Sequence, residues 1–203
     1  LPVVEDVNDQ RVIADRIAIY DNFIATNRKR IRLLEESARL LFREWFVYFR
    51  FPNHEKVKIV NGVPEGWRKE KLNKLVSFLG GHAFKSTSYK QEGKYGIVTI
   101  KNVQQGNFIS ECTDYLDEPP NTMKKHCFLS NGDILISLTG NVGRVCLVYG
   151  ENYLLNQRVA KIEPKNKTPK SFIYWMLDNP IIQKRIENLS YGAAQQNLSP
   201  IKL

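Results

Sequence analysis

Residues suited to reading nucleic-acid bases gather in five short clusters in the second part of the chain. The clusters occupy residues 80–89, 101–107, 137–141, 156–158 and 191–199, and each combines turn-forming residues with amides, hydroxyls, Lys or Arg. Amide side chains pair with adenine through two hydrogen bonds and Arg pairs with guanine, whereas Lys and hydroxyl groups mostly contact phosphates. One such cluster is usually an ordinary loop, so the prediction of DNA contact depends on their recurrence.

The predicted DNA-contact set consists of the side chains in these clusters that carry the matching hydrogen-bonding groups. Its members are Lys85, Ser86, Thr87, Lys101, Gln104, Thr139, Asn141, Gln157, Arg158, Gln195, Gln196 and Asn197.

No spacing in the chain predicts the cofactor or the metal of an enzyme. The sequence Gly140-Asn141-Val142-Gly143 comes nearest to a Gly-rich cofactor turn, but it lies between two predicted strands rather than between a strand and a helix. None of His54, His82 and His126 has a second ligand three or four residues away on a convincing helix, which argues against zinc. We therefore expect no cofactor, no metal and no catalysis by this chain.

A nuclease site remains an alternative. Glu163-Pro164-Lys165 has the carboxylate-x-lysine spacing that metal-dependent nucleases use, and Asp133 is the only obvious carboxylate upstream of it. A three-residue match of this kind arises often by chance in a charge-rich chain. Pro164 is also expected to end the strand that would present it, so a solvated strand exit is the simpler interpretation.

The charge is distributed unevenly along the chain. Residues 1–55 contain nine Lys or Arg and nine Asp or Glu, whereas residues 56–203 contain 21 and 12, so the net charge of +9 lies entirely in the second part. This distribution predicts that the second part meets a polyanion while the neutral first part meets protein. No apolar stretch approaches the roughly 20 residues that span a bilayer, and no signal-peptide pattern occurs. We therefore expect no membrane association and a cytoplasmic protein.

The three cysteines predict neither a disulfide framework nor a zinc site. Cys112, Cys127 and Cys146 are an odd number and show no C-x-x-C spacing. We expect them to be small apolar residues of a β-rich core.

A heptad pattern runs through the first part of the chain. Over residues 13–45 apolar residues recur alternately four and three positions apart, and Asn27 is the one polar exception. The pattern predicts a single helix of about 40 residues and on the order of 60 Å, with Asp6 or Asn8 as its cap and Pro52 closing it. The helix-pairing positions are Ile17, Tyr20, Ile24, Asn27, Ile31, Leu34, Ala38 and Leu41.

Such a helix is longer than the following domain is wide, so that domain cannot bury the whole apolar seam. The seam therefore predicts a partner helix, and Asn27 fits a register-fixing role because a buried amide is costly unless it meets a matching group. A long core helix with Asn27 near the end of its contact is the alternative.

The remaining pattern predicts an α+β fold, in which a long coiled-coil-type helix is followed by a globular β-rich domain with flanking helices. Residues 53–66 are polar and rich in Gly and Pro, which is typical of a linker. The predicted elements after it are a short amphipathic helix near residues 68–79, strands near residues 97–103, 133–138, 144–149 and 159–164, and helices within residues 169–189 that Pro180 interrupts.

Five ordered motifs resemble the specificity subunits of type I restriction-modification systems. GDILISLTG at residues 132–140 with NQRVA at 156–160 is similar to the core of their target-recognition domains. Two further motifs, VPEGW at residues 63–67 and QQNLS at residues 195–199, are similar to the sequences at the two edges of such a domain. The heptads with Asp21, Asn27, Leu34 and Glu35, followed by LFREWFV at 41–47 and FRFP at 49–52, resemble the spacer helix of the family.

The resemblance implies a division of labour. In this family two recognition domains, held apart by two antiparallel spacer helices, each read one half of a bipartite DNA site. Methyltransferase subunits dock on this frame and methylate adenine, and a separate motor subunit cuts. The implied partners are therefore double-stranded DNA, the methyltransferase subunits and, through them, the motor and nuclease subunit.

The resemblance also assigns the parts of the chain. It implies a spacer helix in residues 1–52, a linker in 53–66 and a target-recognition domain in 67–203. One helix and one domain stand where the family has two of each, so we expect either a fragment or a half-length subunit that forms a homodimer through its helix. The helix length would then set the half-site separation.

Within the resemblance, residues 156–158 recur whatever the DNA target, which implies packing or phosphate contacts. We expect the loop after Gly81 and the hairpin near Gln104 to carry the specificity. A protein-binding coiled-coil scaffold without sequence-specific DNA contact is the alternative function.

Overall fold

The structure is a computed structural model that describes residues 6–190, with side chains described as far as residue 188. The chain divides into two compact units, Leu1–Lys56 and Val57–Leu203. Among the described residues no helix is both long enough and apolar enough to cross a membrane.

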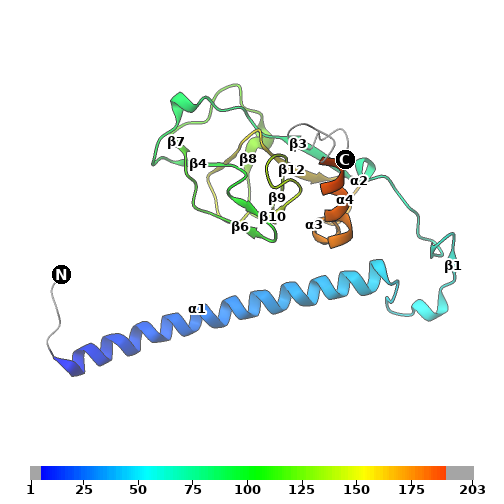
Figure 1. Cartoon of the computed structure of the whole chain (residues 1–203), viewed down its shortest axis with the longest axis horizontal. Helices are drawn as coiled ribbons and strands as arrows, with labels where there is room; N and C mark the ends of the chain where they lie inside the picture. Colours follow the sequence, from blue (N-terminus) through cyan, green and yellow to red (C-terminus); the bar gives the residue numbers. More distant parts are fainter. Residues whose placement is uncertain (1–5, 191–203) are drawn as a thin grey trace. The chain divides into compact units, whose positions relative to one another are not determined.

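The first unit is dominated by one helix, α1 (Val7–Phe42), which continues without a break into the π-helical turn η1 (Arg43–Val47) (Figure 1). The carboxylate of Asp6 caps it by accepting hydrogen bonds from the backbone amides of Asn8 at 2.6 Å and Asp9 at 3.3 Å. The predicted helix of about 40 residues and its cap at Asp6 are confirmed, but the helix ends at Val47 rather than at Pro52.

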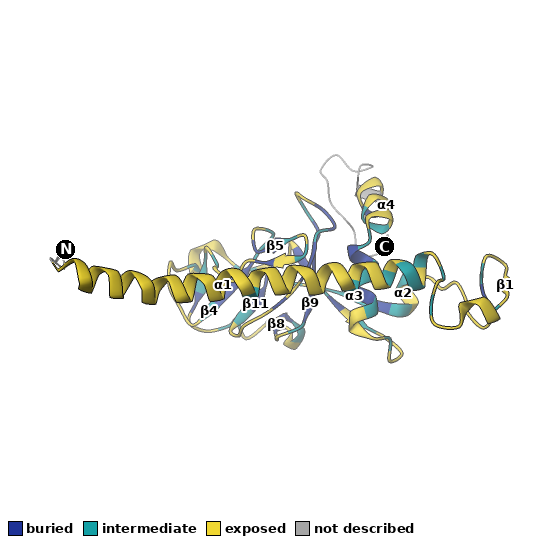
Figure 2. Cartoon of the chain, turned by 90° about the horizontal axis from the view of Figure 1, so that it is seen from below, coloured by how far each residue is buried: buried dark blue, intermediate teal, exposed yellow. Residues whose placement is uncertain are grey.

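No residue of α1 is buried, and the helix is coloured as exposed along almost its whole length in Figure 2. Six of the eight predicted pairing positions are exposed, and Asn27 and Ala38 are half-buried. A helix this long takes most of its stability from packing of its apolar face. The seam of α1 is therefore left without a partner inside its own unit.

The second unit contains two four-stranded sheets. The first has the order β10-β9-β12-β3, and all its neighbouring strands are antiparallel. Its strands are β3 (Val76–Gly80), β9 (Ile134–Ser137), β10 (Val145–Leu147) and β12 (Val159–Pro164). The strands expected near residues 133–138, 144–149 and 159–164 are confirmed, and β12 ends at Pro164 as predicted.

The second sheet has the order β7-β4-β11-β8 and contains one parallel pair, β4 with β11. Its strands are β4 (Tyr95–Val98), β7 (Tyr115–Leu116), β8 (Phe128–Leu129) and β11 (Tyr153–Leu155). Two short hairpins lie outside these sheets, β1 (Ile59–Val60) with β2 (Val63–Pro64) and β5 (Val103–Gln104) with β6 (Asn107–Phe108). The second unit also contains the 3-10 turns η3 (Ser86–Ser88) and η4 (Lys125–Cys127), and the 3-10 turn η2 (His54–Lys56) ends the first unit.

Three helices flank the sheets, namely α2 (Leu72–Leu75), α3 (Lys170–Asp178) and α4 (Pro180–Ser190). Pro180 stands at the first position of α4, because a proline lacks the N–H group that the middle of a helix needs but tolerates the first turn. The Asn179 side chain accepts a hydrogen bond from the Ile181 amide at 2.9 Å beside this break. The predicted interruption at Pro180 is confirmed.

The core forms on both faces of β9, whose four residues are all buried (Figure 2). Successive side chains of a strand point to opposite faces. Ile134 and Ile136 belong to the cluster that contains Leu177 of α3, whereas Leu135 belongs to the cluster that contains Leu155 of the second sheet. The layers are therefore helices, first sheet and second sheet.

Cys127 and Cys146 are free and buried in the cluster between the two sheets, and Cys112 is free and half-buried beside it. Their predicted role as small apolar core residues agrees with this packing.

Two expectations about secondary structure were wrong. The helix expected over residues 68–79 is only four residues long, because Val76–Gly80 forms β3 and pairs along its whole length with β12. The strand expected over residues 97–103 ends at Val98, where a turn separates it from β5. In the first place pairing with the distant β12 outweighs the local pattern. In the second place Asn102 holds a turn by hydrogen bonds with Thr99, and β5 pairs with the neighbouring β6.

Candidate nucleic-acid interface

The loop that follows β3 begins at a tight backbone contact. A Cβ atom on Gly81 would lie 2.3 Å from the Asn156 carbonyl oxygen, so only glycine fits there. The His82 amide donates to the Leu155 oxygen at 2.8 Å, and the Gln157 amide donates to the His82 oxygen at 3.0 Å. These contacts join the start of the loop to the turn at residues 156–158.

The three predicted contact residues of this loop are exposed. Lys85 precedes the 3-10 turn η3, and Ser86 and Thr87 lie within it. The amide of Ser88 donates to the Lys85 oxygen at 3.0 Å and the amide of Tyr89 donates to the Ser86 oxygen at 3.1 Å. A fixed turn therefore presents a cation and two hydroxyl groups to solvent.

The turn at residues 156–158 is held by its buried Asn156, whose Oδ1 accepts from the Arg158 amide at 3.1 Å. The side chains of Gln157 and Arg158 are exposed. Burial and, next to it, the charge of Asp114 raise the pKa of Tyr89 above its usual value, and the charge of Arg158 offsets only part of this increase. Arg158 is thus within electrostatic range of the end of the η3 loop.

A second group of predicted residues lies around the β5–β6 hairpin. Asn102 fixes the turn before it, because its Oδ1 accepts from the Thr99 amide at 2.9 Å and its Nδ2 donates to the Ile109 and Glu111 oxygens, each at 2.9 Å. Lys101 in this turn is exposed, and its carbonyl oxygen accepts from Gln104 Nε2 at 2.9 Å.

The tip of the β5–β6 hairpin is also held by hydrogen bonds to α3 and β10. Gln105 donates to Asp178 on α3 and accepts from the Val145 amide at 3.2 Å. The amide of Gly106, whose φ of +72° favours glycine, donates to the Val145 oxygen at 2.8 Å. Gln104 is therefore carried by a hairpin whose tip is hydrogen-bonded to α3 and β10.

The loop between β9 and β10 supplies Thr139 and Asn141. Asn141 is exposed, whereas Oγ1 of Thr139 is buried and has no hydrogen-bond partner among residues 6–190. The end of the loop that leads into β10 is held by α4, because Gln183 Nε2 donates to the Gly143 oxygen at 2.9 Å.

Arg144 connects these two loops and was absent from the predicted contact set. Its Nη1 donates to Gln104 Oε1. With the Asn141 amide turned so that its oxygen faces the guanidinium, that oxygen accepts from Arg144 Nη2 at 2.9 Å and from Nη1 at 3.1 Å. The sequence could have indicated Arg144 as a contact residue, because it is a cation directly after Gly143. The apolar pattern instead placed it in the strand predicted over residues 144–149.

The structure thus arranges the described candidates in two groups. Lys85, Ser86 and Thr87 are joined to the turn of Gln157 and Arg158, and Lys101 and Gln104 are joined through Arg144 to the loop with Thr139 and Asn141. The two groups meet where the Leu138 amide donates to the Arg158 oxygen at 2.9 Å. Gln195, Gln196 and Asn197 lie outside the described residues.

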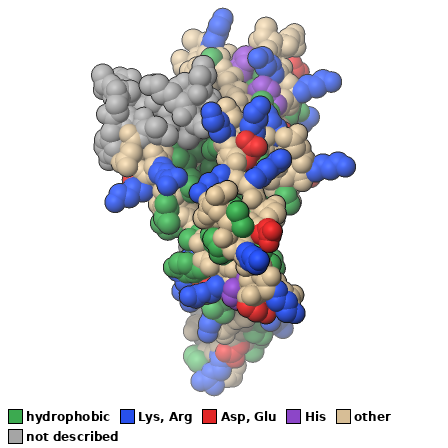
Figure 3. Space-filling model, turned by 90° about the vertical axis from the view of Figure 1, so that its right-hand side faces the viewer, with side chains coloured by type: hydrophobic (Ala, Val, Ile, Leu, Met, Phe, Trp, Pro, Cys, Tyr) green, Lys and Arg blue, Asp and Glu red, His purple; other side chains and the backbone are tan. Residues whose placement is uncertain are grey.

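On the face of the molecule that Figure 3 shows, Lys and Arg side chains are much more frequent than Asp and Glu. The surface agrees with the excess of basic residues after residue 55. A positive surface attracts the phosphate backbone independently of sequence, and fixed polar loops add contacts to base edges.

The carboxylates of the nuclease alternative are engaged by lysines. Asp133 Oδ2 lies 2.8 Å from Lys161 Nζ, and Glu163 Oε2 lies 3.8 Å from the same nitrogen. Lys165 instead donates to the Asn73 carbonyl oxygen at 2.9 Å. Within residues 6–190 no group of three or more His, Cys, Asp or Glu side chains is arranged to hold a metal.

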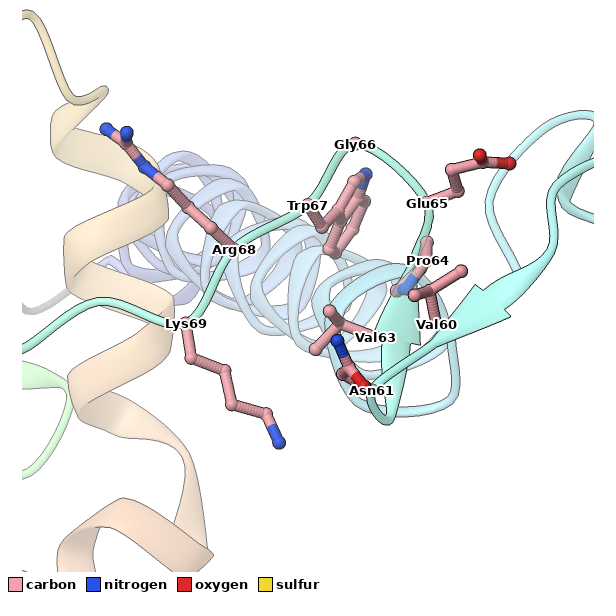
Figure 4. A pocket seen from close by; sticks show the side chains of 9 residues that line it. All are labelled: Val60, Asn61, Val63, Pro64, Glu65, Gly66, Trp67, Arg68 and Lys69. Atoms are coloured by element: carbon pink, nitrogen blue, oxygen red, sulfur yellow. The ribbon is translucent and has the colours of Figure 1, made fainter.

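An open pocket of about 390 Å³ lies beside the β1–β2 hairpin (Figure 4). It is lined by Val60, Asn61, Val63, Pro64, Glu65, Gly66, Trp67, Arg68 and Lys69. The Trp67 amide donates to the Pro64 oxygen at 2.9 Å across a turn in which Gly66 has a φ of +85°. The pocket contains none of the predicted contact residues.

The comparisons with known proteins agree on one family. The model of the type I restriction modification DNA specificity domain matches residues 64–203. The specificity subunit of the type I restriction enzyme MjaVIII of Methanocaldococcus jannaschii is 26% identical over 203 residues, which cover 96% of this chain and 47% of that protein. The HindI specificity subunit of Haemophilus influenzae is 26% identical over 142 residues, which cover 68% of this chain and 30% of that protein.

Solved structures show the same fold. The S subunit of a type I restriction-modification system from M. genitalium has a TM-score of 0.55 and 20% identity, covering 93% of this chain and 46% of that chain. A chain from a structure on complex assembly and conformational transition of the type I R-M system has a TM-score of 0.54 and 17% identity, and the match covers 100% of this chain and 46% of that chain. The chain spans about half the length of the M. jannaschii relative. Because the family model matches most of its residues, the protein belongs to the type I restriction-modification DNA specificity domain family.

Proposed function

We propose that this chain reads DNA sequence for a type I restriction-modification system, and that residues 67–203 recognise one half of a bipartite site. The observation that carries the proposal is the family match over residues 64–203, which includes every predicted contact loop. In the loops within residues 6–190, exposed polar side chains are held on turns with hydrogen-bonded backbones, which suits contacts to base edges.

We propose that residues 1–52 act as the spacer helix and residues 53–66 as the linker to the recognition domain. The exposed apolar seam of α1 supports pairing with a second spacer helix. That helix belongs either to the other half of a longer specificity subunit or to a second copy of this chain. The separation of the two half-sites would then follow from the length of the helix pair.

We further propose that the chain itself is not catalytic. Methyltransferase subunits would dock on the paired helices and methylate adenine, and they would bring in the motor and nuclease subunit. The engagement of Asp133 and Glu163 by Lys161 supports a structural role for these carboxylates. We expect the assembly to work on DNA in the cytoplasm.

The test is selection from a pool of random-sequence duplex DNA, carried out with the chain alone and with the methyltransferase subunits of its own system. Sequencing of the retained duplexes should reveal one short motif, paired with its inverse at fixed spacing if two copies assemble. The variant Lys85→Ala should bind the same pool with less discrimination between sites.

Sequence-independent binding that falls steeply with salt, with no motif even when the methyltransferase is present, would overturn the proposal. The coiled-coil scaffold would then be the better explanation. Magnesium-dependent cleavage by the purified chain alone would instead support the nuclease alternative.

A further inference from the structure

Arg144 lies between two loops of the candidate interface, and its side chain is only partly exposed. We propose that Arg144 reads a guanine of the recognised half-site, and that Gln104 and Asn141 hold its guanidinium in the reading orientation. This inference rests on the proposed function and assigns a residue and a base type within it.

The amides of Gln104 and Asn141 engage one side of the guanidinium. Nη1 donates to the oxygen of Gln104. With the Asn141 amide turned so that its oxygen faces the guanidinium, that oxygen accepts from both Nη1 and Nη2. A guanidinium has five N–H groups and no acceptor. These contacts use both N–H groups of Nη1 and one of Nη2.

The groups that remain are Nε–H and the second N–H of Nη2, for which no acceptor is recorded in residues 6–190. They lie on the same edge of the planar guanidinium and point in parallel. Guanine presents two acceptors, O6 and N7, at matching spacing in the major groove, and a bidentate Arg is the commonest specific contact to them. The free edge of Arg144 is therefore a ready guanine-binding fork.

The backbone beneath Arg144 is fixed as well. Its amide donates to Ser137 Oγ at 3.1 Å and its carbonyl oxygen accepts from the Ser137 amide at 3.0 Å. The Ser137 hydroxyl also donates to the Asn141 carbonyl oxygen, and the Gly143 amide donates to the Ser137 oxygen at 2.9 Å. One serine thus ties together both ends of the loop that carries Asn141 and Arg144.

A fixed guanidinium favours base reading over a phosphate contact. Discrimination between bases requires donors in a defined position, and a side chain that is already ordered loses little entropy when it binds. A phosphate accepts hydrogen bonds from flexible surface lysines equally well.

The same geometry changes the role expected for Gln104. Its Oε1 accepts from Arg144, and its Nε2 donates to the Lys101 oxygen at 2.9 Å, so both ends of the amide are engaged within the protein. Gln104 is therefore a positioning residue for Arg144 rather than a base-reading residue.

The experiment is the random-duplex selection repeated with four variants in the presence of the methyltransferase subunits. Arg144→Lys keeps the charge and removes the fork, Arg144→Gln offers an amide that pairs with adenine, and Gln104→Ala removes one positioning contact. Lys94→Ala is the charge control, because it removes one cation from the loop before β4 in the second sheet. Circular dichroism and thermal unfolding establish that each variant is folded.

We expect the wild-type chain to enrich a motif that contains a G·C pair which Arg144→Lys no longer prefers. The loss at that one pair should be between about fivefold and about 150-fold, the range of a bidentate Arg–guanine contact. Arg144→Gln should shift the preference at that pair toward A·T, Gln104→Ala should weaken it by a smaller factor, and Lys94→Ala should keep the motif unchanged.

An Arg144→Lys variant that enriches the wild-type motif with full strength would overturn the inference while leaving the proposed function intact. So would an Arg144→Gln variant that loses affinity equally for all sequences with a shallower dependence on salt, because that result identifies a phosphate contact. Absence of any motif for the wild-type chain would overturn the proposed function itself.

Discussion

The ammonium group of Lys161 lies 2.8 Å from Oδ2 of Asp133, and the two side chains are only 14% and 4% exposed. Asp133 also accepts from the Ser130 amide at 2.9 Å and lies 3.7 Å from the ammonium group of Lys170. The pair therefore ties β9 and β12 to the first turn of α3. Asp133 lies within the motif at residues 132–140 that resembles the family, and Lys161 directly follows the motif at residues 156–160.

Removing one partner of this pair should destabilise the second unit. Asp133→Ala leaves the mostly buried charge of Lys161 with only the half-exposed Glu163, 3.8 Å away, as an ion-pair partner. We expect this variant to lower the free energy of unfolding by about 3 kcal/mol. Asp117→Ala is the matched control, because its partner Lys90 and Asp117 itself are more than half exposed, and it should cost less than about 1 kcal/mol. Urea unfolding measures both, and equal losses would contradict the structural role of Asp133.

Two neighbouring glycines should respond differently to the same substitution. Gly81→Ala places a Cβ 2.3 Å from the Asn156 oxygen, whereas a Cβ on Gly80 would meet nothing within 4 Å. We expect Gly81→Ala to cost about 1 to 3 kcal/mol through overpacking and to shift the backbone of the 156–158 turn. Gly80→Ala should be nearly neutral. Denaturant unfolding and amide chemical shifts would show this, and a neutral Gly81→Ala would refute the close approach.

The buried thiols should make the protein less stable at high pH. Burial raises the pKa of the Cys146 thiol to about 12, well above the usual range of a cysteine. Above about pH 9 the unfolded chain releases this proton while the folded chain keeps it, so unfolding becomes more favourable by up to about 1.4 kcal/mol per pH unit. Cys146→Ala should therefore lose less stability than the wild type between about pH 8 and about pH 10.5. Parallel pH profiles for the two proteins would contradict the raised pKa.

The seam of α1 should mediate self-association. Ile24 and Leu34 are 48% and 70% exposed, and an aspartate at either position would place a charge in the predicted helix pair. We expect the wild-type chain to dimerise at micromolar concentration and Ile24→Asp and Leu34→Asp to be monomeric in sedimentation experiments. Lys29→Asp introduces the same residue away from the seam and should remain dimeric. A monomeric wild-type chain would show that the helix pairs only within a longer subunit or with another protein.

Segments with a regular apolar pattern, and segments that end at a proline, could be predicted from the amino-acid sequence alone. The heptads specified α1 without reference to the rest of the chain, because a helix closes its hydrogen bonds within four residues. The apolar runs of β9 and β12 were recognisable since both faces of these strands are covered, and Pro180 marked the break between α3 and α4.

Contacts between distant segments could not be predicted in this way. Residues 76–80 form β3 because they pair with β12, some 80 residues away in the sequence. Likewise, β11 is a strand because it pairs in parallel with β4. Arg144 became a candidate only when Gln104 and Asn141 were brought to its guanidinium. Strand pairing and side-chain networks join residues far apart in the sequence, and their free energy appears only when the whole sheet is assembled.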